Sequence, residues 1–187
     1  MPSTALTSAK VLRMLWTGVV KLTLFAAIAL SQSSAHNPAP VPQREFSADD
    51  AEVQHPATLP DSILNVLAHD QVIEELDGRP QPSGSVFSAE KLRSPSPGTQ
   101  LYMVMGVGPL KGANVSPFWL IRENSRTHQA AILWSSGALN VSLHYRSGSS
   151  YPEITSGSVT MQHANVFTYR YRSDKEKYLR TRSGKRL

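Results

Sequence analysis

The stretch that decides the fold is LNVSLHYR, residues 139–146, in which every second side chain from Leu139 to Tyr145 is apolar. A strict period of two is typical of a strand with one buried face and one solvated face, the usual arrangement in antiparallel sheets. FTYRYR, residues 167–172, alternates in the same way and places tyrosines on one face and arginines on the other. The sequence therefore predicts an antiparallel sheet with arginines on its solvent-exposed face.

Working outward, shorter strands are expected over residues 85–92, 101–105, 118–122 and 130–134, with a terminal hairpin through 174–179. LYMVM at 101–105 is apolar on both faces, which indicates a central strand. The serine and glycine segments at 147–150 and 156–158 are expected to be hairpin turns.

Before the strands, residues 61–76 place Ile63, Val66, Ile73 and Leu76 on one helical face. The predicted fold class is α+β, mainly β, with one N-terminal helix packed on a meandering antiparallel sheet.

Residues 1–35 have the layout of a secretory signal peptide. They contain no acidic residue, carry Lys10 and Arg13 before an apolar run over 22–30, and end in small residues at Ala35. Cleavage near Ala35 would make the domain periplasmic or secreted. The alternative is an uncleaved inner-membrane anchor over residues 12–30. Burying the charged Lys21 in the membrane would raise the free energy of inserting this segment by about 3 kcal/mol.

The rest of the chain divides by composition. Residues 36–60 contain five prolines and are expected to be a flexible leader, 61–181 a single α+β domain, and 182–187 a basic tail. Residues 36–99 hold four basic and ten acidic residues, and residues 100–187 hold twelve and four. The two halves therefore attract each other, and the sequence pI of 9.6 does not by itself indicate a nucleic-acid partner.

Catalytic motifs are sparse. There is no cysteine, none of the six histidines has metal-binding spacing, and the serine-rich segments lack Gly-x-Ser-x-Gly. We therefore expect neither a metal nor a cofactor. The alternative of a cell-envelope hydrolase would use Glu123 or Glu153 together with a histidine.

Two segments could carry binding. In the glycine-rich loop at 106–114 and the strand after it, Lys111, Asn114 and Trp119 are candidates for a small recognition patch, although core packing is the default for Trp119. The basic run after residue 169 could contact an anionic envelope component, another periplasmic protein or the acidic helix of the same chain. Export argues against nucleic acid.

Four pieces of the chain, LKGAN at 110–114, PFWL at 117–120, SYPEI at 150–154 and FTYRY at 167–171, resemble a group of uncharacterised secreted bacterial proteins. In similar proteins the first strand pair often carries an acidic loop of the calcium-binding type, whereas RSPSPGT at 93–99 has no carboxylate. The resemblance implies export and this fold, and no activity. We expect an exported, non-catalytic binding or envelope-associated domain, and the sequence does not identify its ligand.

Overall fold

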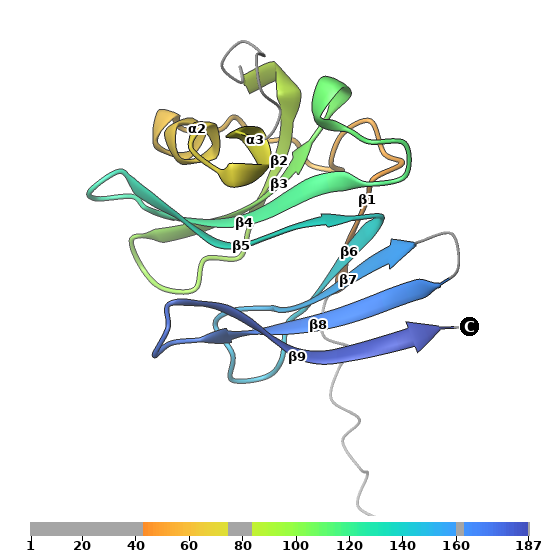
Figure 1. The fold of residues 1–187 in the computed structure, drawn as a ribbon. Helices are drawn as coiled ribbons and strands as arrows, with labels where there is room; N and C mark the ends of the chain where they lie inside the picture. The colour runs from red at the N-terminus through yellow and green to blue at the C-terminus, as the bar shows by residue number, and fades with distance from the viewer. Residues whose placement is uncertain (1–42, 75–83, 160–162, 187) are drawn as a thin grey trace, which may run out of the picture. The chain divides into compact units, whose positions relative to one another are not determined.

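The computed structural model describes residues 43–74, 84–159 and 163–186, which all belong to one compact unit, Val41–Leu187 (Figure 1). The predicted signal peptide, residues 36–42 of the leader and the expected end of the helix at residues 75–78 lie outside the described residues. No helix within the described ranges is long and apolar enough to cross a membrane.

The unit is mostly β, with two antiparallel sheets. One sheet has the order β2-β3-β4-β5 and the other the order β1-β6-β7-β8-β9. The bounds are β1 Gln43–Ser47, α2 Asp61–Ala68, α3 Gln71–Glu74, the 3-10 turn η1 Gly84–Val86, β2 Phe87–Leu92, β3 Thr99–Gly106, the 3-10 turn η2 Gly108–Leu110, β4 Ser116–Asn124, β5 Gln129–Ala138, β6 Asn140–His144, β7 Glu153–Val159, β8 Ala164–Arg172 and β9 Lys177–Arg186. The expected meander from β2 to β9 is present, but it folds over at Leu139, between β5 and β6, to make two sheets.

The elements form three layers, with the helices on one side of the four-stranded sheet and the five-stranded sheet on its other side (Figure 1). Alternation along β4 supplies both cores. Phe118 and Leu120 face the other sheet, Trp119 and Ile121 face α2, and all four are fully buried. β3 alternates in the same way, which confirms the expectation that its unbroken apolar run is a central strand. Burial on both faces therefore explains the continuous hydrophobic run.

The predicted helix is interrupted at residues 69–70. It begins at Asp61, as expected after Pro60, but α2 ends at Ala68 and α3 restarts at Gln71. The backbone carbonyl of Asp70 accepts the Ile73 N–H at 2.9 Å, so Asp70 starts the second turn. Aspartate favours the start of a helix over its interior, which accounts for the break.

The prediction of a flexible leader is wrong from Gln43 onward. Gln43–Ser47 forms β1 and pairs with β6, and Phe46 and Val53 are buried between the sheets. The Ala57 N–H also donates to the Ala89 carbonyl at 2.7 Å, along the edge strand β2. Proline-rich composition predicted extended backbone, which a short edge strand also has, and composition does not report long-range pairing.

Two further expectations differ from the structure. Ser156–Ser158, expected as a turn, lies inside β7, where Ser156 is buried and Gly157 pairs with Asn140 and Val166. The expected basic tail from Arg182 continues β9 as far as Arg186, with Arg182 opposite Thr168. An edge strand with exposed side chains needs no apolar alternation, so the pattern at this end carried no strand signal.

Candidate functional site

The structure does not assemble the predicted recognition patch. Lys111 is half-buried and Asn114 exposed in the loop before β4, whereas Trp119 is fully buried beneath α2. The Trp119 and Phe87 rings pack in a T-shaped arrangement with their centroids 5.8 Å apart. Trp119 is therefore a core residue, as core packing predicts, and of the three candidate patch residues only Lys111 and Asn114 are accessible.

Glu123, the first candidate carboxylate, lies in β4 with 6% of its surface exposed. Ser62, at the start of α2, donates its hydroxyl to Glu123 Oε1 at 2.8 Å. Burial raises the pKa of the Tyr102 phenol, and the charge of Glu123 and a hydrogen bond to it raise that pKa further. Glu123 thus accepts hydrogen bonds from two hydroxyl groups.

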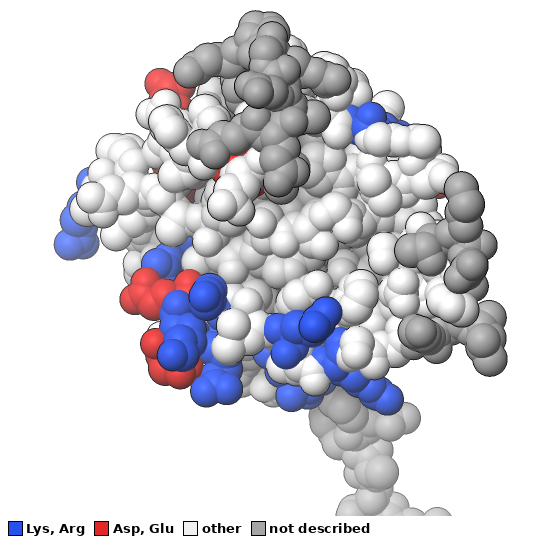
Figure 2. All heavy atoms as spheres, in the orientation of Figure 1, with Lys and Arg blue, Asp and Glu red and all other residues white. Residues whose placement is uncertain are grey.

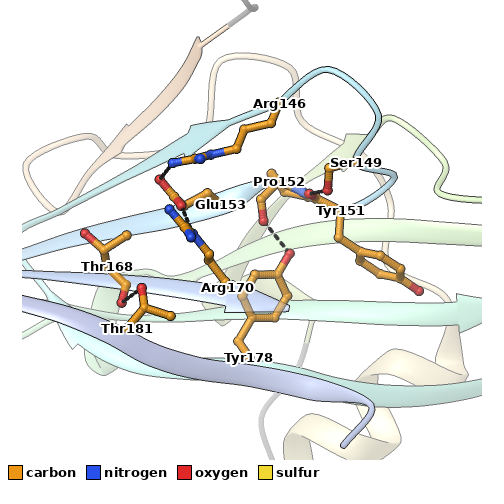
Figure 3. Close-up of polar contacts among 9 residues, drawn as sticks. All are labelled: Arg146, Ser149, Tyr151, Pro152, Glu153, Thr168, Arg170, Tyr178 and Thr181. Carbon is orange, nitrogen blue, oxygen red and sulfur yellow. Dashed lines mark hydrogen bonds and ion pairs between the residues drawn. The ribbon is translucent and has the colours of Figure 1, made fainter. Parts of the chain in front are cut away.

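Glu153, the second candidate, lies at the start of β7 between two arginines (Figure 3). Arg146 donates to Glu153 Oε1 at 3.0 Å, and Arg170 donates to Oε2. Burial alone would raise the pKa of Glu153, but the hydrogen bonds and charges of Arg170 and Arg146 outweigh it and hold that pKa below its usual value. His144 stands opposite Glu153 in the ladder, yet both carboxylate oxygens are taken by guanidinium groups.

The candidate histidines are spread over the fold. His128 lies in the turn before β5 with a φ of 51°, His144 is half-buried in β6, and His163 precedes β8. Within the described ranges, no three side chains among His, Asp and Glu gather as metal ligands would.

A hollow with a volume of about 720 Å³, which we call the polar hollow, opens among the described residues. It lies where the start of α2, the β2–β3 loop and the β4–β5 hairpin meet the loop before β7. Its lining is dominated by amide and hydroxyl side chains and consists of Ser62, Asn65, Ser96, Thr99, Arg122, Asn124, His128, Gln129, Ala130, Ala131 and Tyr151.

Arg122 and Tyr151 form one wall of the polar hollow and are held firmly. Arg122 donates to Glu176 at 3.1 Å and to the Tyr171 hydroxyl at 3.5 Å. The pKa of Arg122 is raised, chiefly by a hydrogen bond to Tyr151. Burial acts in the opposite direction and lowers this pKa, whereas the hydrogen bond to Glu176 raises it further. Tyr151 stacks on Tyr171 with ring centroids 3.9 Å apart.

The loop that carries Tyr151 is also fixed at its backbone. Ser149 donates its hydroxyl to the Tyr151 carbonyl at 2.6 Å, and Tyr178 donates to the Pro152 carbonyl at 2.7 Å (Figure 3). Burial of Tyr178 raises the pKa of its phenol, so it stays a neutral donor at ordinary pH. A smaller hollow of about 150 Å³ is also lined by Tyr151, together with Arg146 and Glu153.

Strands β8 and β9 and their turn, residues 164–186, form what we call the cationic hairpin, with eight basic and two acidic residues. As predicted, Tyr169 and Tyr171 pack against the inter-sheet core while Arg170 and Arg172 are exposed. Figure 2 shows the lysines and arginines gathered over this part of the surface. Arg172, the last residue of β8, pairs with Asp174 in the following turn at 3.1 Å.

Several cations of the cationic hairpin stay available to a partner. Lys175, Lys177 and Arg182 are exposed and form no ion pair with any residue in the described ranges. Arg180 lies over the Phe167 ring at 5.4 Å. The alternative that these charges neutralise the acidic end of the helix concerns Glu74, Glu75 and Asp77. Glu74 ends α3, and residues 75–77 lie outside the described residues.

Comparison with known proteins gives no match among family models, curated proteins or solved structures. The polar hollow was missed by sequence reasoning, because its residues come from five separate segments with no common motif. The cationic hairpin was visible in the sequence, since its charges lie close together along the chain.

Proposed function

We propose that the protein is an exported, non-catalytic binding domain that attaches to an anionic, phosphate-bearing component of the cell envelope through the cationic hairpin. The observation that carries this proposal is the set of exposed cations without an ion-pair partner in the described ranges: Lys175, Lys177 and Arg182. An exposed cation that forms no ion pair can contact a phosphate group without first giving up another partner. Export rests on the composition of residues 1–35.

Both candidate carboxylates support a binding role over hydrolysis. A general base needs a carboxylate oxygen free to take a proton from its substrate. Glu123 is buried and accepts from Ser62, and Glu153 is neutralised by Arg146 and Arg170. The rival hydrolase would have to break one of these sets of bonds before it could act.

The test measures binding to vesicles containing 30% phosphatidylglycerol and to vesicles of phosphatidylcholine alone. A lysine or arginine near an anionic surface contributes about 1 kcal/mol, so Lys177→Gln with Arg182→Gln should weaken binding roughly 30-fold. Raising the salt from 0.15 M to 1 M should also weaken it, because the screening length falls from about 8 Å to about 3 Å.

The matched control removes the same charge elsewhere, with Lys91→Gln and Arg126→Gln, two exposed cations outside the hairpin. Binding by this control should change less than threefold. Equal losses in the two double variants, or binding that ignores salt, would overturn the proposal. Hydrolysis of purified envelope polymer by the wild-type protein, abolished by Glu123→Gln or by Glu153→Gln, would replace the proposal with the enzymatic alternative.

A further inference from the structure

We infer that the polar hollow is a second binding site, built for a short, uncharged saccharide. This inference goes beyond the proposed function and does not rest on it, because none of the described lining residues of the polar hollow belongs to the cationic hairpin. Its volume of about 720 Å³ falls in the range of pockets that enclose small ligands.

The hydrogen-bonding groups of the lining suit a ligand rich in hydroxyls. Asn65, Asn124 and Gln129 contribute planar amides, each able both to donate and to accept. Asn124 Oδ1 already accepts from two backbone N–H groups, those of Arg126 at 3.0 Å and Thr127 at 3.2 Å. That bonding fixes the side chain and leaves its amide nitrogen as a donor. A sugar hydroxyl donates and accepts, so it matches such a mixed set.

Tyr151 supplies an aromatic wall of the kind on which the C–H face of a sugar ring can rest. Tyr151 borders both hollows, whereas Tyr171, on which its ring stacks, borders only the smaller one. The bonds from Ser149 and Tyr178 to the backbone of the Tyr151 loop keep this wall in place. A preorganised wall lowers the entropic cost of binding.

The charge of the lining favours a neutral ligand over a phosphate or carboxylate. Arg122 is the one guanidinium among the described residues of the lining, and it is already paired with Glu176 at 3.1 Å. Glu123 lies buried behind Ser62, whose hydroxyl it holds. An anion would have to displace Glu176 from Arg122, whereas an uncharged saccharide can use the site as it stands.

The experiment titrates the full chain with maltotriose and with the N-acetylglucosamine trimer by calorimetry, at 0.15 M and 0.5 M NaCl. We expect at least one trisaccharide to bind, with an affinity that changes less than twofold with salt. Asn65→Ala and Gln129→Ala should each weaken that binding about fivefold, the effect of one ordinary hydrogen bond. Both residues are exposed, so neither substitution threatens the core.

Asn140→Ala and Gln71→Ala are the matched controls, because both residues are exposed and lie outside the lining. Their affinities should equal that of the wild type. The inference is overturned if neither trisaccharide binds at 10 mM, or if the Asn65 and Gln129 variants bind as tightly as their controls. Vesicle binding is measured separately and depends on salt, so its failure and the failure of this site are distinguishable.

Discussion

Replacing Trp119 with alanine tests whether this residue stabilises the helix layer or recognises a ligand. The side chain is fully buried and packs with Phe87, Ile63 and Leu67 between β4 and α2. Truncating a buried aromatic ring removes its transfer free energy and leaves a cavity, at a cost of about 3–5 kcal/mol. Because domains are stable by roughly 5–15 kcal/mol, this loss would consume a large part of the total.

The assay is urea unfolding followed by far-ultraviolet circular dichroism, with thermal unfolding as a second measure. A loss of about 3–5 kcal/mol should lower Tm by roughly 6–20 °C in a chain of this size. Asn114→Ala is the matched comparison, since this exposed loop residue should change the free energy of unfolding by less than about 0.5 kcal/mol. If Trp119→Ala costs less than about 1 kcal/mol, the packing argument is refuted.

Two further predictions concern charged pairs. Arg44→Ala should destabilise the protein by about 2 kcal/mol, because it leaves the buried Glu90 carboxylate without its ion-pair partner. Glu90 is 3% exposed and pairs with Arg44 at 3.1 Å. The expected loss is smaller than the usual cost of about 3–5 kcal/mol for breaking a buried pair, because the Arg44 side chain is 45% exposed. Adding Glu90→Gln should restore much of the loss in urea unfolding, and a loss unchanged by the second substitution would contradict this account. The pKa of Glu153 is held low in the folded state, so this group stabilises the fold above the ordinary carboxyl pKa of about 4.3, and that stability disappears as pH falls through the lower folded pKa. Glu153→Gln should therefore lower the free energy of unfolding at pH 7 and flatten its decline from pH 5 to pH 3, and an unchanged pH profile would show that Arg146 and Arg170 contribute nothing to stability through this carboxylate.

Much of the local structure could be predicted because it depends on side-chain periodicity within a few residues. The alternation at 139–146 and 167–172 predicted β6 and β8, and the doubly apolar run at 101–105 predicted the central strand β3. The start of the helix at Asp61 followed from the same kind of local pattern. The cationic hairpin was predictable as a surface for the same reason, since its arginines alternate with tyrosines that pack inward.

The longer-range features needed the tertiary structure. β1 pairs with β6 through Gln43 and His144, about a hundred residues apart in the chain, and no local pattern encodes such a partner. The predicted patch failed because alternation along β4 alone does not say whether the face bearing Trp119 meets solvent or a helix.

The sequence by itself therefore determined the strands other than β1 and β7, the helix start and the sign of the charge on the terminal hairpin, because each depends on neighbours along the chain. Only the tertiary structure decided that the meander folds into two sheets, that residues 43–47 close one of them, and that five segments meet around the polar hollow. The physical reason is that strand pairing and layer packing are set by contacts between distant residues, whose free energy depends on how whole faces fit together.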